Sequence, residues 1–309
     1  MAKKGSIQIW LEYAVAFSVL GFLRILPRKT AFWLGVSTGR LSYHLLGRLR
    51  KIGLRNLELA FPEKSESERT HILKAAFRNL GRVMATVSQF GKLNIDNMGE
   101  LIEYDIDPLF AASYEKLKSD GRGRILLGGH LGNWELQAFS YSVFYEPISF
   151  LARKMDNPRI EEMVLAIRTR FGNKQIDKAN SATKIVRVLR GGGTVGVLAD
   201  INSHPKEGVF VPFFGIQACT ISGVAMLAQR TNAAIVPAFA IWDEGKGKYF
   251  MVHDNIIEPA NTGDRKRDIV ETTALYAAAT ERVIRAYPDQ WLWIHRRWKT
   301  RPPGEPGIY

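Results

Sequence analysis

The sequence lacks the features of several protein classes. Its 309 residues include a single cysteine, Cys219, which excludes an intramolecular disulfide and suits a reducing compartment. No low-complexity tract is present, so we expect a sizeable core. Zinc-ligand spacing, a helix-turn-helix pattern and an aromatic RNA-binding signature are also absent. The net charge of +13 therefore points to an anionic partner other than nucleic acid, such as a membrane surface or an acidic protein.

The N-terminal apolar run is interrupted by only two charges. Residues 7–26 are mostly apolar, with Glu12 and Arg24 as exceptions, and their length approaches a membrane span. Glu12 would be costly near a bilayer centre, so a tilted or interfacial helix is an alternative, as is a buried amphipathic helix. Basic residues precede the run as in a signal peptide, but no clear small-residue cleavage site follows Leu26. Spanning and interfacial arrangements both stay open.

Basic and apolar residues alternate after this run. The stretch 40–55 mixes arginine and lysine with leucine and tyrosine, a mixture that suits an anionic lipid surface. Positive charge concentrated after the apolar run places the body on the cytoplasmic side. We therefore expect a membrane-bound protein whose body lies on the cytoplasmic face.

The rest of the chain alternates between strand and helix patterns, which predicts an α/β fold with a mixed central sheet covered by helices. Residues 1–60 are predicted as two or three membrane-facing helices, and residues 61–309 as the catalytic domain, opening with a helix capped by Ser65 and running to about Gln89. Further helices are predicted near 108–119, 132–143, 157–171, 182–190, 221–231 and 266–286. Strands are predicted near 124–128, 147–152, 194–199, 209–213, 234–241 and 248–253.

His130 and Glu135 form the most informative pair of side chains. On one regular helix, positions five apart point about 140° away from each other. The two can meet only if His130 lies in the turn before a helix and Glu135 reaches back from its first turns. Gly128, Gly129 and Gly132 permit such a turn and leave the backbone open to a substrate. A carboxylate that holds the imidazole in one tautomer makes a general base, and amides at the helix start could stabilise an oxyanion.

The spacing alone is weak and favours a structural histidine, whereas the strand, glycine turn and helix around His130 favour the catalytic interpretation. His253 and Glu258 repeat it without a glycine turn or a following helix, so we interpret that pair as chance. Residues 35–39 fit the nucleophile-elbow pattern but lie between helices, which predicts a helix-packing or turn role. Residues 191–196 fit the dinucleotide-binding glycine pattern with helix and strand in reverse order, which predicts a helix-to-strand turn.

Several local motifs resemble those of the bacterial lipid A biosynthesis acyltransferases, of lauroyl and myristoyl type, within the lysophospholipid acyltransferase superfamily. The similarity covers almost the whole chain. It is carried by His130–Glu135, Ala152–Pro158, Leu198–Asn202, Gly208–Gly215, Ile235–Ala238 and Pro288–Lys299. Glu135 stands where the wider superfamily usually has aspartate, and Ile201 stands where many relatives carry glutamine.

The resemblance implies transfer of an acyl chain from acyl carrier protein to a hydroxyl of a lipid A precursor. His130 would be the base and Glu135 its orienting partner, with no metal, cofactor or covalent acyl-enzyme. Gly132 and Asn133 of the same motif would contact the substrate. Both the carrier protein and the phosphorylated lipid are acidic, which agrees with the basic net charge.

Other residues carry two interpretations each. Arg153 could bind a phosphate, polarise a thioester carbonyl or be a surface charge. Asp200 ends an apolar strand-like run, where it could support His130 or cap a turn. The tail residues are expected on a solvated surface or on a lipid or carrier-protein contact; they are His295, Arg296, Arg297, Lys299 and Arg301 with Trp291, Trp293 and Trp298. Phe210, Phe213 and Phe214 are expected in a core or along an acyl groove.

Two alternatives remain from the sequence. One is acylation of another glycolipid or of a lysophospholipid. The other is a non-catalytic membrane-surface protein in which His130 is structural. Acyl length, the acceptor position and the oligomeric state do not follow from the sequence.

Overall fold

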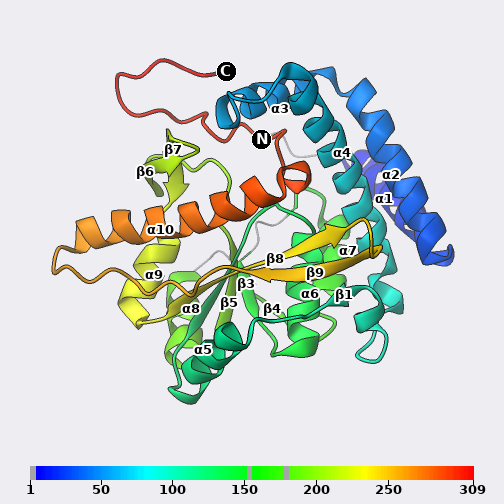
Figure 1. Ribbon diagram of the computed structural model, residues 1–309. Coiled ribbons are helices and arrows are strands. Elements are labelled where there is room, and N and C mark those ends of the chain that lie inside the picture. Colours follow the sequence, from blue (N-terminus) through cyan, green and yellow to red (C-terminus); the bar gives the residue numbers. More distant parts are fainter. Residues whose placement is uncertain (1–4, 152–154, 177–180) are drawn as a thin grey trace.

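A seven-stranded mixed sheet forms the centre of the molecule (Figure 1). The computed structural model describes residues 5–151, 155–176 and 181–309. The strands are β1 (Ile102–Glu103), β2 (Arg124–Gly128), β3 (Ser149–Leu151), β4 (Lys174–Ile176), β5 (Thr194–Leu198), β6 (Gly208–Phe213), β7 (Ile216–Ile221), β8 (Ala234–Asp243) and β9 (Lys248–His253). Their order is β1-β9-β8-β2-β5-β3-β4, with all neighbours parallel except the β8–β9 pair. Strands β6 and β7 form a separate antiparallel hairpin.

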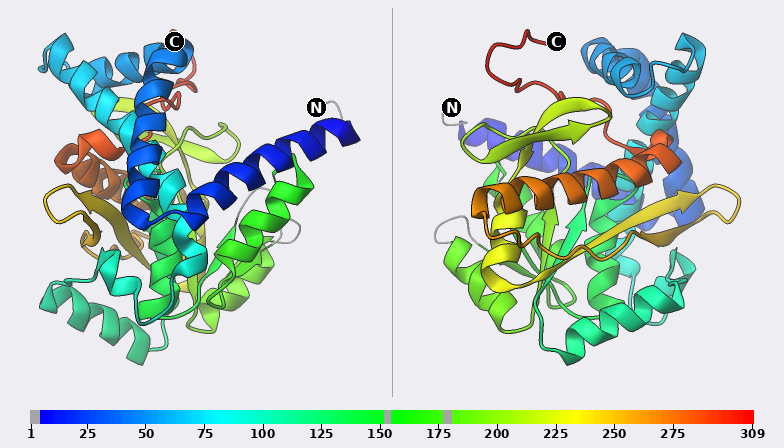
Figure 2. Two further views of the ribbon diagram at one scale, coloured as in Figure 1. Left: turned by 90° about the vertical axis from the view of Figure 1, so that its right-hand side faces the viewer. Right: turned by 60° about the vertical axis from the view of Figure 1, so that its left-hand side comes forward.

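Helices cover both faces of the sheet (Figures 1 and 2). They are α1 (Ser6–Ile25), α2 (Arg28–Leu45), α3 (Gly47–Ala60), α4 (Glu66–Gln89), α5 (Pro108–Ser119), α6 (Trp134–Phe144), α7 (Pro158–Arg168), α8 (Ser181–Arg190), α9 (Gly223–Thr231) and α10 (Arg265–Ala286), with short 3-10 turns η1 (Phe90–Lys92), η2 (Met98–Glu100) and η3 (Pro288–Gln290). The sequence-predicted α/β class is confirmed.

Strand β2 shows why both sheet faces are buried. Ile125 and Leu127 pack in a cluster with residues of α8, α9 and α10, whereas Leu126 packs in a second cluster with residues of α5 and α6. Alternate side chains of a strand point to opposite faces, so a strand covered on both sides is apolar throughout. Every residue of β2 is buried, and the central position of this strand fixes the loop that follows it.

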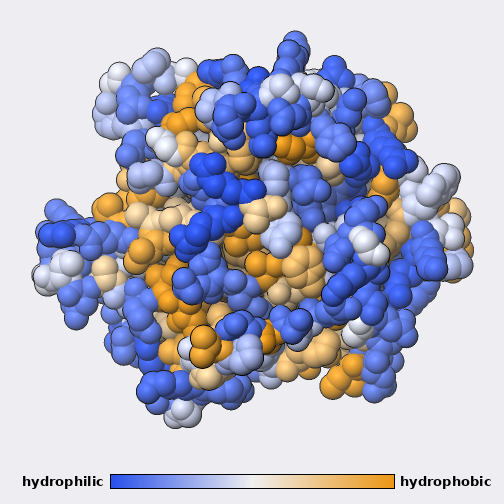
Figure 3. Space-filling view, in the orientation of Figure 1, coloured by the Kyte–Doolittle hydropathy of each residue, from blue (hydrophilic) through white to orange (hydrophobic). Residues whose placement is uncertain are grey.

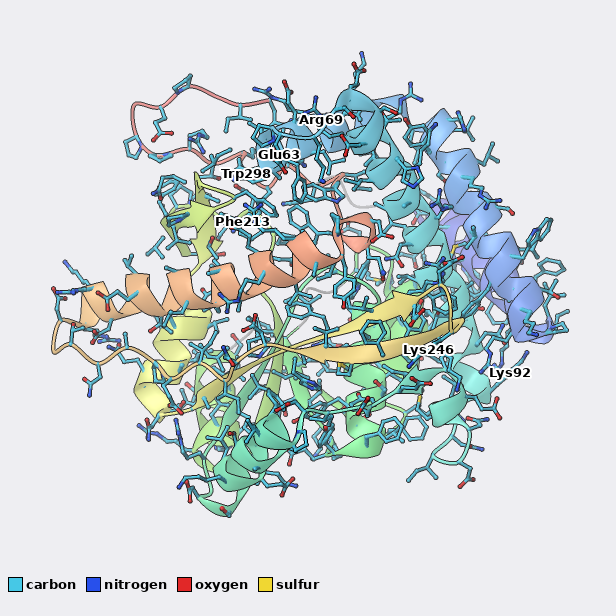
Figure 4. All side chains as sticks on the ribbon, in the orientation of Figure 1. Glu63, Arg69, Lys92, Phe213, Lys246 and Trp298 are labelled. Carbon is cyan, nitrogen blue, oxygen red and sulfur yellow. The ribbon has the colours of Figure 1, made fainter. Side chains whose placement is uncertain are left out.

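A third core lies beyond the sheet, between the β6–β7 hairpin, α3, α4 and the chain after η3. Phe213 and Trp298 lie next to each other in it (Figure 4), with ring centroids 6.0 Å apart. Trp291, Trp293 and Trp298 are at most 2% exposed. The prediction of a surface tail is therefore wrong for these tryptophans, because their large rings fill the core between the hairpin and the N-terminal helices.

The N-terminal helices pack through glycines. A Cβ added to Gly35 would lie 2.4 Å from the carbonyl oxygen of Gly81 in α4, and one added to Gly39 would lie 2.2 Å from that of Phe77. Helix α2 thus approaches α4 more closely than larger residues would allow, which confirms the helix-packing interpretation of residues 35–39. Helix α4 begins with the predicted capping box of Ser65 and Glu68.

Most predicted elements have observed counterparts, while β1, β4 and β7 were not predicted. Strands β1 and β4 have two and three residues, too few to show a period. Residues 191–196 lead from α8 into β5, with Gly192 at φ +74°, which confirms a helix-to-strand turn. The division at residue 60 into anchor and catalytic domain stays a prediction.

Candidate active site

His130 and Asp200 meet where two adjacent parallel strands end. Gly128 of β2 is in register with Leu198 of β5, so residues two positions further along each chain leave the sheet side by side. The Nδ1 atom of His130 lies 2.9 Å from Oδ1 of Asp200, and the backbone N–H of His130 donates to Oδ2 at 2.7 Å. Asp200 therefore holds both the ring and the backbone of His130.

Asp200 receives a third hydrogen bond from the C-terminal segment. The indole Nε1–H of Trp291 donates to Oδ2 at 2.8 Å, and Asp200 is 2% exposed. Burial alone would favour the neutral acid, but the charge of His130 and hydrogen bonds from His130 and Trp291 outweigh it and lower the pKa of Asp200 to about 2. The buried side chain is thus a carboxylate at any physiological pH.

This carboxylate sets the protonation of His130. Burial lowers the pKa of the imidazole, but the charge and hydrogen bond of Asp200, with a further charge effect from Glu135, raise it above the ordinary value. A carboxylate on Nδ1 assigns the ring proton to Nδ1 in the neutral tautomer and leaves the Nε2 lone pair to accept a proton. The side chain is 20% exposed, so a substrate can reach it. The pair has the geometry of a general base.

Glu135 lies in the first turn of the helix that follows His130, as expected, but its carboxylate is paired with an arginine. Its carboxylate forms a bidentate ion pair with Arg168 of α7, with Arg168 Nε donating at 2.9 Å and Nη2 donating to the other oxygen. Among the described residues, Asp200 is the carboxylate that hydrogen-bonds Nδ1 of His130. Tertiary packing explains this: Glu135 lies in the first turn of α6, which packs against α7, while Asp200 follows the neighbouring strand β5. Glu135 acts on His130 through charge.

The turn between β2 and α6 depends on Gly132 and Asn133. Gly132 has φ +60°, and a Cβ there would lie 2.0 Å from the carbonyl oxygen of Ala240. The N–H of Asn133 donates to that same carbonyl at 2.8 Å, and Oδ1 of Asn133 accepts from the N–H of Leu136 at 3.0 Å. Both residues therefore shape the turn and cap α6. Asn133 is fully buried, and a substrate contact of either residue stays a prediction.

Gln290 of η3 and the segment after it connect the loops that carry His130 and Asp200. The N–H of Leu292 donates to the carbonyl of His130 at 3.0 Å, and the N–H of Gly132 donates to that of Gln290 at 3.0 Å. The N–H of Asn202 donates to Nε2 of His295 at 3.0 Å. Sequence reasoning missed these positioning roles of Trp291 and His295. The signal in the sequence is a tryptophan-rich motif, for which a solvated surface or a lipid or carrier-protein contact is expected.

Arg297 of the same segment is also a correction. It was expected on a surface, but it is fully buried, with Nη1 donating to the Cys219 carbonyl at 2.9 Å and Nη2 donating to Oγ1 of Thr220 at 2.6 Å. Burial lowers the pKa of Arg297 to about 10, against the charge of Asp200. The guanidinium stays charged and provides a positive potential on the buried side of Asp200.

Two further predictions concern the second histidine–glutamate pair and Arg153. Glu258 pairs with Arg122, and His253 packs on Phe110 at 4.3 Å between ring centroids, so the repeated spacing is chance. Burial lowers the pKa of His253 to about 4. Arg153 lies outside the described residues.

Phe213 and Phe214 are buried in the core as predicted, and Phe210 is half-buried. Within residues 5–151, 155–176 and 181–309, no group of three or more histidine, cysteine, aspartate or glutamate side chains is placed to hold a metal ion.

Fold and site define an α/β enzyme with a histidine–carboxylate pair at the carboxyl edge of its sheet. A profile of the family described as "Bacterial lipid A biosynthesis acyltransferase" matches residues 3–300. The chain is 30% identical to the lipid A biosynthesis lauroyltransferase of Escherichia coli K12 over 304 residues, 97% of this chain and 95% of that protein. It is 27% identical to the palmitoleoyltransferase of the same strain over 301 residues, 97% and 94% of the two chains, and 24% identical to its myristoyltransferase over 303 residues, 90% of each. The chain belongs to the bacterial lipid A biosynthesis acyltransferase family.

Proposed function

We propose that this protein transfers a fatty acyl chain from acyl carrier protein to a hydroxyl group of a lipid A precursor at the cytoplasmic face of the inner membrane. The observation that carries the proposal is the fixed imidazole of His130, whose Nδ1 is bound to a buried carboxylate in a chain of this family. An imidazole held in this way is prepared to take a proton from an alcohol.

The reaction would proceed by direct transfer. Nε2 of His130 takes the proton of the acceptor hydroxyl while its oxygen attacks the thioester carbonyl. The carbon–sulfur bond then breaks, and the carrier-protein thiolate leaves and receives the proton from the imidazolium. The first amides of α6, those of Trp134 and Glu135, have no acceptor within the helix and would stabilise the oxyanion. No acyl-enzyme is required.

Asp200 and Glu135 would share the support of His130. Asp200 fixes the tautomer and orientation through Nδ1. Glu135 adds negative charge that favours the imidazolium formed during transfer. Arg168 holds Glu135 in place and compensates its charge where both side chains are largely shielded from solvent. The proposed dyad of His130 and Glu135 thus includes Asp200 as the residue that orients the ring.

Apolar side chains surround the mouth of the site. Leu198 and Ile201 flank Asp200 and are 37% and 38% exposed, and Leu151 at the end of β3 is 44% exposed. Two strand ends therefore present hydrocarbon to solvent beside a catalytic base, which suits an acyl chain. The net charge of +13 would attract both an acidic carrier protein and a phosphorylated lipid. Arg153 is proposed to bind a phosphate or to polarise the thioester.

Lipid mass spectrometry of cells that lack and then regain this chain tests the proposal. Restoring the chain should add the mass of one acyl group to lipid A and leave the phospholipids unchanged. A gain confined to another glycolipid or to phospholipids would favour acylation of those acceptors instead. Complementation by a His130→Ala variant would favour a non-catalytic membrane-surface protein.

Glu135 provides a graded prediction. Glu135→Gln keeps an acceptor for Arg168 but removes the charge, and we expect transfer to fall about 10-fold. Glu135→Ala also leaves the guanidinium of Arg168 unpaired near His130, which disfavours the imidazolium, so we expect a loss of about 10²-fold. Initial rates with labelled acyl carrier protein measure both, with circular dichroism as the fold check. Equal rates for Glu135→Ala and the unchanged enzyme would exclude an electrostatic role.

The N-terminal helix provides a second prediction. Among the described helices, α1 is the one that is long and apolar enough to cross a membrane by length and composition. Deleting residues 1–26 should release much of the protein to the soluble fraction after cell lysis, because the exposed apolar side chains of α1, among them Leu11, Val15 and Phe22, are lost. The measure is the membrane-bound fraction by immunoblot. Full retention of the shortened chain on membranes would mean that the basic surface of residues 40–55 suffices for binding.

A further inference from the structure

Helix α1 exposes one apolar face and turns its acidic residue away from it. Leu11, Val15 and Phe22 are 62%, 64% and 55% exposed, whereas Leu23 on the opposite side is 4% exposed. Glu12 lies on the body-facing side, where Asn157 Nδ2 donates to its carboxylate at 3.2 Å. The sequence predicts that Glu12 would make a membrane-spanning helix costly. In the structure, the exposed face of α1 carries no charged side chain between Ser6 and Leu23.

Polar groups of the body hold the N-terminal half of α1. Nδ2 of Asn157, the N-cap residue of α7, donates to the carbonyl of Ile9 at 2.8 Å. The guanidinium of Arg159 lies 3.5 Å from the ring centroid of Trp10, a close cation–π contact. Figure 2 (left) shows α1 and α7 extending from the body side by side.

The C-terminal end of α1 is held as well. Nε2 of Gln89, a buried side chain at the end of α4, donates to the carbonyl of Leu23 at 2.5 Å. Nζ of Lys92 donates to the carbonyl of Leu26 at 2.8 Å. Figure 4 shows Lys92 below the end where α1 joins α2. The helix is thus fastened to the body at both ends rather than tethered by a single linker.

The attachment of the N-terminal half of α1 to α7 conflicts with a span across the bilayer. A helix of 20 residues is about 30 Å long, which is the thickness of the hydrocarbon layer. If α1 crossed it while bound to the body, α7 would enter the lipid with Arg159, Glu161 and Glu162. Such charges are expensive in hydrocarbon. A helix lying in the interface keeps these charges in water and still buries its apolar face.

We propose that α1 lies along one leaflet of an anionic membrane as a docked interfacial helix and does not cross it. This inference rests on the membrane location proposed above. Arg24 and Lys29, both exposed at the α1–α2 junction, would contact lipid phosphates. The face with α10 in front mixes hydrophobic side chains in the middle of the view with hydrophilic side chains along most of the outline (Figure 3). Because α7 also carries Arg168, the partner of Glu135, the leaflet lies next to the catalytic site.

Site-directed labelling tests this arrangement. Gly5→Cys places a thiol at the start of α1, where an added Cβ meets no atom within 4 Å, and Ser6→Cys is a second variant at the same end. Ser119→Cys, at the exposed end of α5, reports the side on which the body lies. Cys219 is fully buried, so the unchanged chain is the blank. Intact spheroplasts and inverted vesicles are treated with a membrane-impermeant maleimide.

The interfacial arrangement predicts that residues 5 and 119 react from the same side of the membrane. Reaction from opposite sides would show that α1 spans and would overturn the proposal. Recovery of the protein in the soluble fraction would also overturn it, whereas loss of acyl transfer with same-side labelling would contradict only the proposed activity.

Depth measurement gives an independent result. A fluorophore on Val15→Cys, near the middle of α1, is measured with the protein in vesicles that contain anionic phospholipid. Spin labels near the headgroups should quench it at least 2-fold more than spin labels at the chain ends. The reverse order would place residue 15 at the bilayer centre and contradict an interfacial helix.

Discussion

Acyl transfer by His130→Ala should fall about 10²–10⁴-fold while the protein stays folded, because the acceptor hydroxyl loses its base. That loss corresponds to about 3 to 5 kcal/mol of transition-state stabilisation. The imidazole packs on Trp134, at 5.1 Å between ring centroids, and is partly exposed, so its removal leaves no large void in the core. Initial rates with labelled acyl carrier protein and a lipid A precursor measure the effect, and thermal melting checks the fold.

His253→Ala is the matched control. His253 shares the five-residue spacing to a glutamate, but it lies against Phe110 and its lowered pKa reflects burial alone. Its removal should cost some stability and change the rate less than about 3-fold. Equal rate losses at the two histidines would show that the context of His130 has no catalytic meaning. A folded His130→Ala protein with near-normal transfer would refute the mechanism.

Asp200→Asn should cost about 10²–10⁴-fold as well, because an amide cannot replace this carboxylate. Both of its oxygens accept: Oδ1 faces Nδ1 of His130, and Oδ2 receives N–H groups from His130 and Trp291. If the amide nitrogen of asparagine took the place of Oδ2, it would face two N–H donors. If it took the place of Oδ1, it would favour the wrong imidazole tautomer, as the corresponding change does in serine proteases.

The pH dependence separates this role from a structural one. The base works only when His130 is neutral, so the rate should fall as the pH drops through the pKa of His130, which Asp200 raises above the ordinary histidine value. Asp200→Asn removes that charge, lowers the pKa and should move the acidic limb of kcat/KM to lower pH while the plateau falls. An unchanged limb at a reduced plateau would mean that Asp200 only maintains the fold.

Much of this site follows from the sequence because its parts are local. His130 was identified by an apolar strand, a glycine turn and a helix start, and all three are present. Asp200 ends a strand-like run, from which the sequence predicts that it either supports His130 or caps a turn. The order of the strands in the sheet cannot be predicted from the sequence. It is the adjacency of β2 and β5 that brings Asp200, rather than Glu135, to Nδ1 of His130. Glu135 was assigned to His130 on spacing, but a long-range contact with Arg168 determines its position.

The C-terminal segment could not be predicted by the same reasoning. Tryptophan and arginine near a chain end usually indicate a surface, and nothing in the local pattern shows that Trp291 donates to Asp200 or that Arg297 is buried behind it. These contacts join residues 77 to 91 positions apart, so they depend on how the β6–β7 hairpin and α3 close over the segment. Trp291 and Arg297 are buried beside Asp200 rather than exposed to solvent.

Transfer by the purified full-length protein tests the central claim most directly. The enzyme is incubated with an acyl carrier protein thioester and a lipid A precursor, and the mass of the lipid product is measured by mass spectrometry. The account predicts one added acyl group, release of the free carrier-protein thiol in equal amount, and no product with His130→Ala. Acylation of a lysophospholipid in place of the lipid A precursor, or equal product from His130→Ala, would contradict it.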